Sequence, residues 1–229
     1  MKSRTDRKKI HIFSDFDGTI TRKDSLEAVL NHFCGTEWQE IEERVTRHEL
    51  TEKESLQMEM DYLHESEETI FRFLTDHIHI DPNFPDFVEY ISHNEIEFTI
   101  LSGGFRSFIQ TILDKYHLSH LKIEANSFEI DNEHWKVIGN PTPKIKNNCN
   151  HCKTHHLIQA KSEGLITIYI GDGNTDRCPA QQADIVFAKG PLASYLTSIG
   201  KDFFPISTFA DVKIKMEELC YNWCASTID

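Results

Sequence analysis

The sequence has little of what a membrane protein or a nucleic-acid-binding protein needs. No stretch approaches the roughly 18 uncharged apolar residues of a transmembrane helix, so we expect no membrane partner. Basic residues are in the minority, because 24 Lys and Arg stand against 37 Asp and Glu, for a formal net charge of −13. This balance argues against a polyanion, so we expect no nucleic acid as partner. Internal repeats and low-complexity segments are also absent.

A secretory signal and a disulfide framework are not expected either. The basic start, residues 1–9, runs into HIFSDFDGT, where Asp15 and Asp17 interrupt the apolar core of a signal peptide too early. The six cysteines of this 229-residue chain are therefore interpreted as thiols in a reducing compartment. We predict a cytoplasmic protein.

The length and composition fit a globular protein with one domain and a sizeable insertion, or with two small domains. Hydrophobic residues make up 39% of the chain and charged residues 27%, which is enough apolar matter for a buried core. Short apolar runs that close on small or acidic residues predict strands at 9–13, 98–101, 166–170, 184–188 and 202–205. Helical patterns between them cover 105–116, 153–163, 176–183 and 207–223. This alternation predicts an α/β protein with a parallel sheet.

Two segments depart from that alternation. Residues 21–81 hold no strand-like run but carry helix-spaced apolar residues, so we predict a helical insertion there, with 1–20 and 82–229 forming the core. This region also carries most of the negative charge, which favours a solvated helix face. Residues 123–138 alternate in polarity and predict a shorter β-hairpin insert with its turn near Asp131 and Asn132.

Acidic residues follow two of the predicted strands. Asp15 and Asp17 lie two apart on an extended end, so both can approach one site while Phe16 turns into the protein. Asp172 and Asp176 follow another strand, and loops at the carboxyl ends of neighbouring strands meet in one crevice. Four carboxylates would repel one another there unless a cation lay among them, and Mg²⁺ suits oxygen ligands and a substrate phosphate.

Groups that could bind an anion follow the remaining elements. Ser102, Gly103 and Gly104 close a strand and open a helix, where backbone N–H groups and a hydroxyl can hold a phosphate. Lys153 opens another helix and can supply a fixed positive charge beside a phosphoryl group. Together with the acidic residues, these groups predict phosphoryl transfer.

The run from Cys149 to Cys152 leaves three interpretations open. The two cysteines and His151, His155 and His156 could pack around Lys153, bind zinc or act in redox chemistry. A closed zinc site needs four ligands, and the chain offers no second CxxC. The redox interpretation lacks the rest of a thioredoxin-like pattern. We place packing first.

The order DFDGT, a lone Ser after a strand, Lys and GDGNTD resembles the four motifs of the haloacid dehalogenase superfamily, over about residues 10–190. This resemblance implies a Rossmann-like core with a helical cap inserted after the first strand, similar to the phosphoserine-phosphatase-like branch. Within that branch, the run from Cys149 to Lys153 and Thr175 look more like the methionine-salvage phosphatases, which act on 2-hydroxy-3-keto-5-methylthiopentenyl-1-phosphate. Phosphoserine and phosphocholine-type esters are the alternative substrates.

The resemblance also implies a role for each matching residue. Asp15 would attack phosphorus and form an aspartyl-phosphate, and Asp17 would protonate the leaving group and later deprotonate water. Mg²⁺ would be held by Asp15, the Asp17 backbone carbonyl and Asp172, with support from Asp176. Phosphate would be bound by Ser102, Gly103 and Lys153. The implied partner is a small phosphorylated metabolite, and the implied assembly is a monomer or homodimer. A regulatory protein on an inactive phosphatase fold would be expected to lack Asp15 or Asp17, and both are present.

Overall fold

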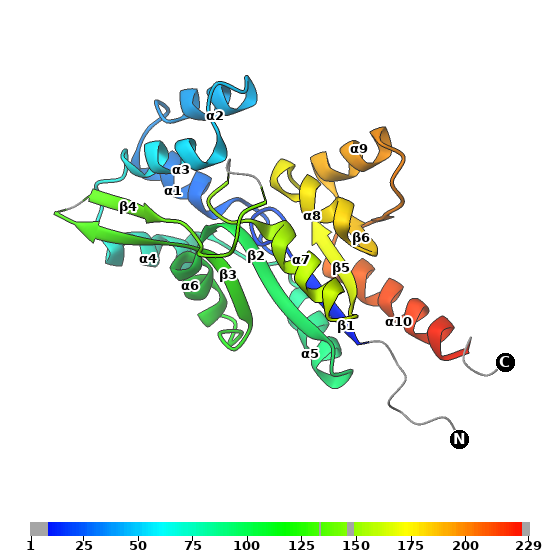
Figure 1. Ribbon diagram of the computed structural model, residues 1–229. Coiled ribbons are helices and arrows are strands. Elements are labelled where there is room, and N and C mark those ends of the chain that lie inside the picture. Colours follow the sequence, from blue (N-terminus) through cyan, green and yellow to red (C-terminus); the bar gives the residue numbers. More distant parts are fainter. Residues whose placement is uncertain (1–8, 133, 146–148, 226–229) are drawn as a thin grey trace.

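A seven-stranded sheet forms the centre of the protein, in the order β4-β3-β2-β1-β5-β6-β7 (Figure 1). The computed structural model describes residues 9–132, 134–145 and 149–225, and side chains as far as residue 219. Neighbouring strands are parallel except for β3 and β4, which are antiparallel. The strands are β1 (Ile10–Ser14), β2 (Glu97–Phe105), β3 (Lys122–Asp131), β4 (His134–Ile138), β5 (Ile166–Gly171), β6 (Ile185–Ala188) and β7 (Phe204–Pro205).

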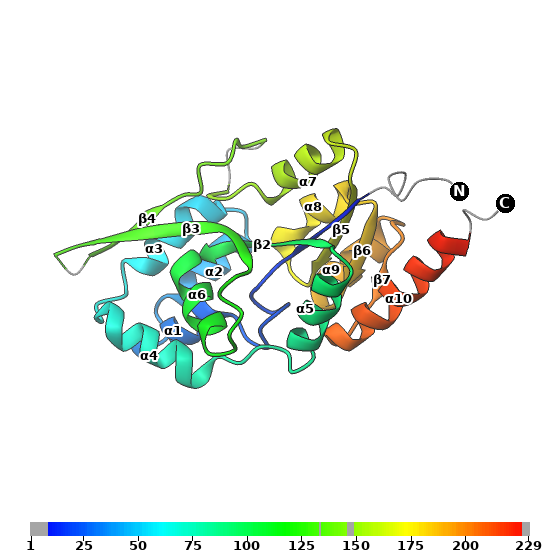
Figure 2. The same ribbon diagram turned by 90° about the horizontal axis from the view of Figure 1, so that it is seen from below.

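Helices cover both faces of this sheet. Figure 2 shows α5 and α10 on one side of the sheet and α7 and α8 on the other. The helices are α1 (Ser25–Phe33), α2 (Gln39–Thr46), α3 (Glu52–Met60), α4 (Glu67–His77), α5 (Phe84–His93), α6 (Arg106–Asp114), α7 (Lys153–Ser162), α8 (Arg177–Gln182), α9 (Gly190–Ser198) and α10 (Phe209–Ala225). The predicted α/β class with a parallel core is confirmed.

The strands are apolar on both faces because each face has its own core. In β5, Ile168 and Ile170 belong to the larger buried cluster, whereas Tyr169 between them belongs to the smaller one under α7, α8 and α9. In β1, Ile12 belongs to the larger cluster and Phe13 to the smaller one. Side chains along a strand alternate between faces, and a sheet covered on both sides needs apolar residues at every position.

The helices α1–α4 lie together beyond one end of the sheet (Figure 1). The chain enters and leaves this segment side by side, because Thr21 and Ile80 form an isolated antiparallel bridge and the Asp81 N–H donates to the Ile20 carbonyl at 2.8 Å. Three of the four helices begin at a side-chain cap, provided by Asp24, Thr51 and Ser66. The division into a cap at 21–81 and a core at 1–20 and 82–229 stays a prediction.

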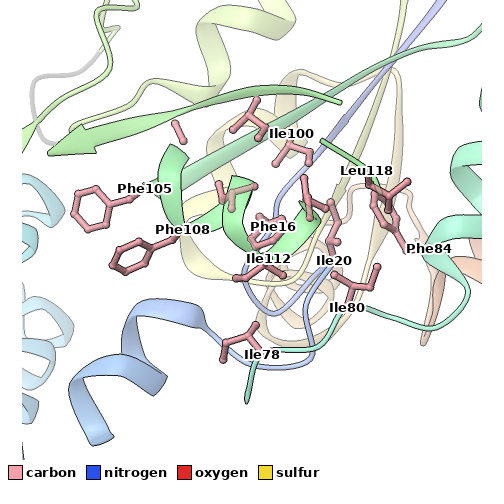
Figure 3. Close-up of a cluster of buried hydrophobic side chains, with 14 of the residues drawn as sticks. Phe16, Ile20, Ile78, Ile80, Phe84, Ile100, Phe105, Phe108, Ile112 and Leu118 are labelled. Atoms are coloured by element: carbon pink, nitrogen blue, oxygen red, sulfur yellow. The ribbon is translucent and has the colours of Figure 1, made fainter. Parts of the chain in front are cut away.

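A continuous apolar cluster joins the turn after β1 to this helical segment. Phe16, fully buried between Asp15 and Asp17, lies among the side chains drawn in Figure 3, near Ile20 and Ile112. The prediction that Phe16 turns into the protein is therefore confirmed. Burial of a Phe side chain is worth roughly 1.5–3 kcal/mol, so this residue anchors the turn that carries the two aspartates.

The structure corrects the interpretation of the hairpin as a separate insert. Its turn is where the sequence predicts it, and Asn132 has a φ of 47°. However, β3 also pairs with β2 and extends the main sheet. Its partner β4 contacts the helical segment α1–α4, because the Gln57 side chain of α3 accepts from the Val137 N–H at 2.8 Å and donates to the Trp135 carbonyl at 3.0 Å. The hairpin therefore links the sheet to this helical segment.

Several boundaries also differ from the prediction. β2 continues to Phe105, so α6 begins one residue later than expected. Helices α5 and α9 were not predicted, although each has a proline in its first turn, a position that suits proline. No helix in the described part of the chain is long and apolar enough to cross a bilayer.

Candidate active site

The predicted site residues meet at the carboxyl ends of the central strands. From β1 the chain builds the sheet outward through β2 and β3, and then returns to the other side of β1 with β5, β6 and β7. Ligands of open α/β sheets bind outside the point where the strand order reverses in this way. Asp15 follows β1, Asp172 follows β5, and Ser102 lies in the carboxyl-terminal part of β2. All three are therefore brought to this edge of the sheet.

Lys153, at the first position of α7, connects two of the carboxylates. Its ammonium group donates to Asp15 Oδ1 at 2.5 Å, to Asp176 Oδ1 at 2.8 Å and to Thr175 Oγ1 at 3.3 Å. Only 4% of its side chain is exposed. Burial alone would lower the pKa of Lys153, but the charges of Asp15 and Asp176 raise it above the ordinary value. Lys153 is therefore a fixed cation beside Asp15.

Asp176 is fully buried and uses both oxygens within the protein. Oδ1 accepts from Lys153 and from the Tyr169 hydroxyl at 2.6 Å, and Oδ2 accepts from the backbone N–H groups of Asp172 and Gly173 at 3.0 Å each. These contacts fix the loop after β5 and the position of Lys153. The sequence did not point to Tyr169, because an apolar strand gives no sign of which buried residue meets the loop above it.

Two glycines give the acidic groups room. A Cβ on Gly18, whose φ is +76°, would lie 2.5 Å from Asp172 Oδ2. A Cβ on Gly171 would lie 2.6 Å from Asp176 Oδ2. Asp172 Oδ1 also accepts from the Thr19 hydroxyl at 2.5 Å, so Thr19 orients this carboxylate. Only glycine permits this approach of the two loops.

Asp17 lies apart from the other carboxylates. Its Oδ1 accepts from the Ser25 N–H at the start of α1, at 2.8 Å. A Cβ on Gly104 would lie 3.2 Å from its Oδ2, so the loop after β2 faces the same carboxyl group. Burial raises the pKa of Asp17, against hydrogen bonds from Ser25 and Ser102. A raised pKa keeps a proton on a carboxyl group at higher pH, as a general acid requires.

Three of the predicted carboxylates can share one ion. Oxygens of Asp15, Asp172 and Asp176 lie within 4.8 Å of one another, and no second such group of three acidic, His or Cys side chains occurs among the described residues. Burial and the charge of Asp176 raise the pKa of Asp15 well above its ordinary range, although Lys153 opposes this. Three hard oxygen donors in so small a space fit a divalent cation such as Mg²⁺.

The structure distinguishes between the packing, zinc and redox interpretations of the run from Cys149 to Cys152. Cys149 and Cys152 join no group of possible metal ligands in the described structure. Burial and the neighbouring Cys152 raise the pKa of the Cys149 thiol, which makes it a poor nucleophile at neutral pH. Packing beside Lys153 is the interpretation that the geometry favours.

The helical segment 21–81 also holds a buried carboxyl group. The Glu59 side chain of α3 is buried, and its Oε1 has no hydrogen-bond partner in the described structure. Burial, followed by the charge of Glu42, raises the pKa of Glu59 to about 8. The charge of this segment predicts a solvated helix face, and for Glu59 that prediction is wrong, because its side chain is buried.

We expect Glu59→Gln to stabilise the protein at pH 8 and to have little effect at pH 5. A carboxyl group whose pKa is raised from 4.5 in the unfolded chain to about 8 in the fold costs increasing stability as the pH rises through that window. Glutamine removes this cost, so the melting temperature at pH 8 should rise by roughly 3–6 °C. Thermal unfolding at both pH values measures the effect, with Glu89→Gln on the exposed face of α5 as control. Equal shifts at both pH values would contradict the explanation.

The chain matches the family described as Putative Phosphatase over residues 10–192. The 2-hydroxy-3-keto-5-methylthiopentenyl-1-phosphate phosphatase of Bacillus cytotoxicus is 31% identical over 215 residues, which cover 92% of this chain and 97% of that protein. The protein of the same name from Bacillus cereus (strain AH820) is 30% identical over 216 residues, with the same coverage.

Solved structures show the same fold. A phospho-aspartyl intermediate analogue of phosphoserine phosphatase has a TM-score of 0.67 and 20% identity, and covers 88% of this chain and 95% of that one. A substrate-bound phosphoserine phosphatase has a TM-score of 0.66 and 17% identity, and covers 88% and 94%. At such identities the likeness concerns the fold alone.

Proposed function

We propose that this chain, which belongs to the Putative Phosphatase family of the haloacid dehalogenase superfamily, hydrolyses 2-hydroxy-3-keto-5-methylthiopentenyl-1-phosphate. It is a phosphomonoester hydrolase of the aspartyl-phosphate type. The observation that supports the assignment of its site is the buried contact between Lys153 and Asp15, since a phosphoryl group attacked by Asp15 would lie beside this cation. The relatives that act on the proposed substrate match almost the whole chain.

In the first step, an Asp15 oxygen attacks phosphorus and the bond between phosphorus and the ester oxygen breaks. Asp17 gives its proton to that oxygen, so the organic product leaves as an alcohol. In the second step, Asp17 takes a proton from water, whose oxygen attacks the phosphorus of the aspartyl-phosphate. Inorganic phosphate leaves and Asp15 is restored. Division of hydrolysis into two displacements lowers each barrier.

The phosphoryl oxygens would be bound by Ser102, Gly103 and Lys153. Ser102 lies near the carboxyl end of β2, and its Oγ accepts from the Gly104 N–H at 2.9 Å. Its hydroxyl proton, which faces Asp17, would turn to a phosphoryl oxygen when phosphate binds. A Cβ on Gly103 would meet nothing within 4 Å, so there is open space above this residue. These neutral and positive donors suit a group whose charge is spread over several oxygens.

Asp15, the Asp17 backbone carbonyl and Asp172 would hold Mg²⁺, and Asp176 would support them through the loop after β5. When bound, the ion supplies positive charge that offsets the charge of the phosphoryl oxygens. The hydrogen bonds of Asp176 to four protein donors favour this supporting role over direct contact. We further propose a cytoplasmic location and a monomer or homodimer, as the sequence predicts.

One observation favours the alternative, a phosphoserine or phosphocholine-type ester. Asp24 begins α1 with an exposed side chain, close enough to Asp17 for the two charges to interact. A carboxylate in that place would suit the ammonium group of such a substrate.

Phosphate release from a panel of phosphorylated metabolites tests the proposal. The expected result is fastest turnover of the methionine-salvage substrate, loss of activity in EDTA and recovery on addition of Mg²⁺. Faster turnover of phosphoserine or phosphocholine would replace the substrate assignment. No release from any member of the panel with Mg²⁺ present would contradict the assignment as a phosphatase of small metabolites.

We expect Asp17→Asn to impair alkyl phosphates much more than activated aryl phosphates. An amide keeps the hydrogen bond to Ser25 but cannot give a proton to the leaving oxygen, and general acid catalysis is typically worth ~10²–10⁴-fold. A good leaving group needs no such proton. Single-turnover rates with an alkyl and a nitrophenyl ester measure the difference. If both substrates lose the same factor, Asp17 is not the acid.

A further inference from the structure

Two buried side chains hold consecutive carbonyl groups of the phosphate-binding loop from behind. His151 Nδ1 lies 2.8 Å from the Ser102 carbonyl oxygen. Asn126 Nδ2 donates to the Gly103 carbonyl oxygen at 2.6 Å. His151 is 5% exposed and Asn126 is fully buried. Neither residue is expected to touch the substrate.

The hydrogen bonds determine which nitrogen of His151 carries its proton. A carbonyl oxygen only accepts, so the nitrogen that faces Ser102 must be Nδ1–H. The other ring nitrogen, Nε2, lies 2.9 Å from His156 Nε2 and must accept if His151 is neutral. Burial lowers the pKa of His151 to about 3 and also lowers that of His156. His156 therefore donates, and it fixes the tautomer of His151.

Further hydrogen bonds close this arrangement into a ring behind the loop. His156 Nε2 lies 3.2 Å from the Thr142 hydroxyl, which donates to Asn140 Oδ1 at 2.5 Å. The Asn140 N–H in turn donates to Asn126 Oδ1 at 2.9 Å. The one proton on His156 Nε2 lies between His151 and Thr142, so this ring links the side chains that hold Ser102 and Gly103 to each other.

The planarity of the peptide bond gives this anchoring a consequence for phosphate binding. In a trans peptide the C=O and the following N–H point in opposite directions. Because His151 holds the Ser102 carbonyl on the buried side, the N–H of Gly103 points away from the core. In the same way, Asn126 holds the Gly103 carbonyl, and the N–H of Gly104 points to Ser102 Oγ.

We propose that His151 is a positioning residue that aims the Gly103 N–H at the phosphoryl oxygens, with His156 as the residue that fixes its tautomer. The CxxC run then has a role that does not involve its sulfur atoms. It carries His151 behind the phosphate-binding loop and ends at Cys152, directly before Lys153. This inference rests on the proposed function, because it assumes that Ser102 and Gly103 bind phosphate.

The test compares His151→Phe with His151→Asn. Phenylalanine removes the donor to Ser102, whereas the Asn amide nitrogen can occupy the place of Nδ1. We expect His151→Phe to raise the KM for p-nitrophenyl phosphate and the inhibition constant of vanadate roughly tenfold, the cost of one misdirected hydrogen bond. His151→Asn should recover most of this loss. The matched control is His155→Phe. The His155 ring lies 6.4 Å from the His156 ring between centroids, and its replacement should leave the KM and the vanadate constant unchanged.

A purely structural role would lower the melting temperature of both variants and leave KM and the vanadate constant unchanged, and that result would overturn the proposal. If His151→Phe does not fold, two other measurements decide. His156→Phe should weaken vanadate binding in the same direction, and nitrogen NMR of the wild-type protein should show His151 as the neutral Nδ1–H tautomer at pH 6. The opposite tautomer would overturn the proposal. Failure of the proposed function is distinguishable, because the wild-type protein would then release no phosphate.

Discussion

Asp15→Asn protein should fold normally and lose turnover. An amide oxygen is too weak a nucleophile to attack phosphorus, and removal of a covalent nucleophile typically costs at least ~10⁴-fold in kcat. The fold should survive because asparagine has the same shape and can still accept from Lys153. Lys153 also keeps its second carboxylate, Asp176. Burial disfavours the charge of Asp15, so the melting temperature should stay unchanged or rise.

The measurement combines activity with trapping of the intermediate. With Mg²⁺ and beryllofluoride, the wild-type protein should carry the analogue on Asp15, and the Asp15→Asn protein should carry none. Asp86→Asn, on the exposed side of α5, is the control for a neutralised aspartate away from the site. Normal hydrolysis by Asp15→Asn protein would remove Asp15 from its role, and so would trapping on Asp17.

The features that the sequence predicts are those with a local signal. Apolar runs ending in Asp15, Ser102 and Asp172 indicate strands that meet at one edge, because parallel strands share the direction of their carboxyl ends. The residue between two acidic positions, Phe16, is assigned to the core by the alternation of side chains alone. The helical nature of the segment between β1 and α5 is also a local signal, because its apolar residues recur at helical spacing.

The features that the sequence does not predict depend on contacts between distant segments. Tyr169 and Asp176 meet across the end of β5, and His151 reaches Ser102, which lies 49 positions away in the chain. Nothing in the neighbourhood of either residue indicates its partner. The need for glycine at Gly18 likewise comes from Asp172, in the loop after β5. A motif therefore identifies the groups that react, whereas the groups that orient them become visible only in the fold.

Lys153→Ala should cause the largest combined loss of activity and stability. Its ammonium group is buried between two carboxylates, and removal of one partner from such a group typically costs ~3–5 kcal/mol because charge is left unpaired. The phosphoryl group would also lose its fixed cation, so kcat/KM should fall by ~10³-fold or more. Lys153→Arg should recover only part, since the planar guanidinium differs in shape and reach.

Two comparisons separate the electrostatic explanation from general damage to α7. Lys161→Ala removes an ion pair from the same helix, but Lys161 and Asp184 are 40% and 38% exposed, and exposed pairs are worth about 1 kcal/mol or less. That variant should remain active and nearly as stable as the wild-type protein. The double variant Lys153→Met with Asp176→Asn should recover part of the stability but not activity, because Asp176 no longer carries an unpaired charge, whereas Asp15 still does and the cation is still missing.

The pH dependence of the Lys153→Ala protein provides the sharpest check. In the absence of Lys153 nothing opposes burial and Asp176, which already raise the pKa of Asp15. A carboxyl group with a raised pKa in the fold destabilises the protein more as the pH rises and less as it takes up a proton. The loss of melting temperature should therefore be smaller at pH 5 than at pH 8. An equal loss at both pH values would mean that α7 is damaged by the lost packing of the Lys153 stem and not by the lost charge.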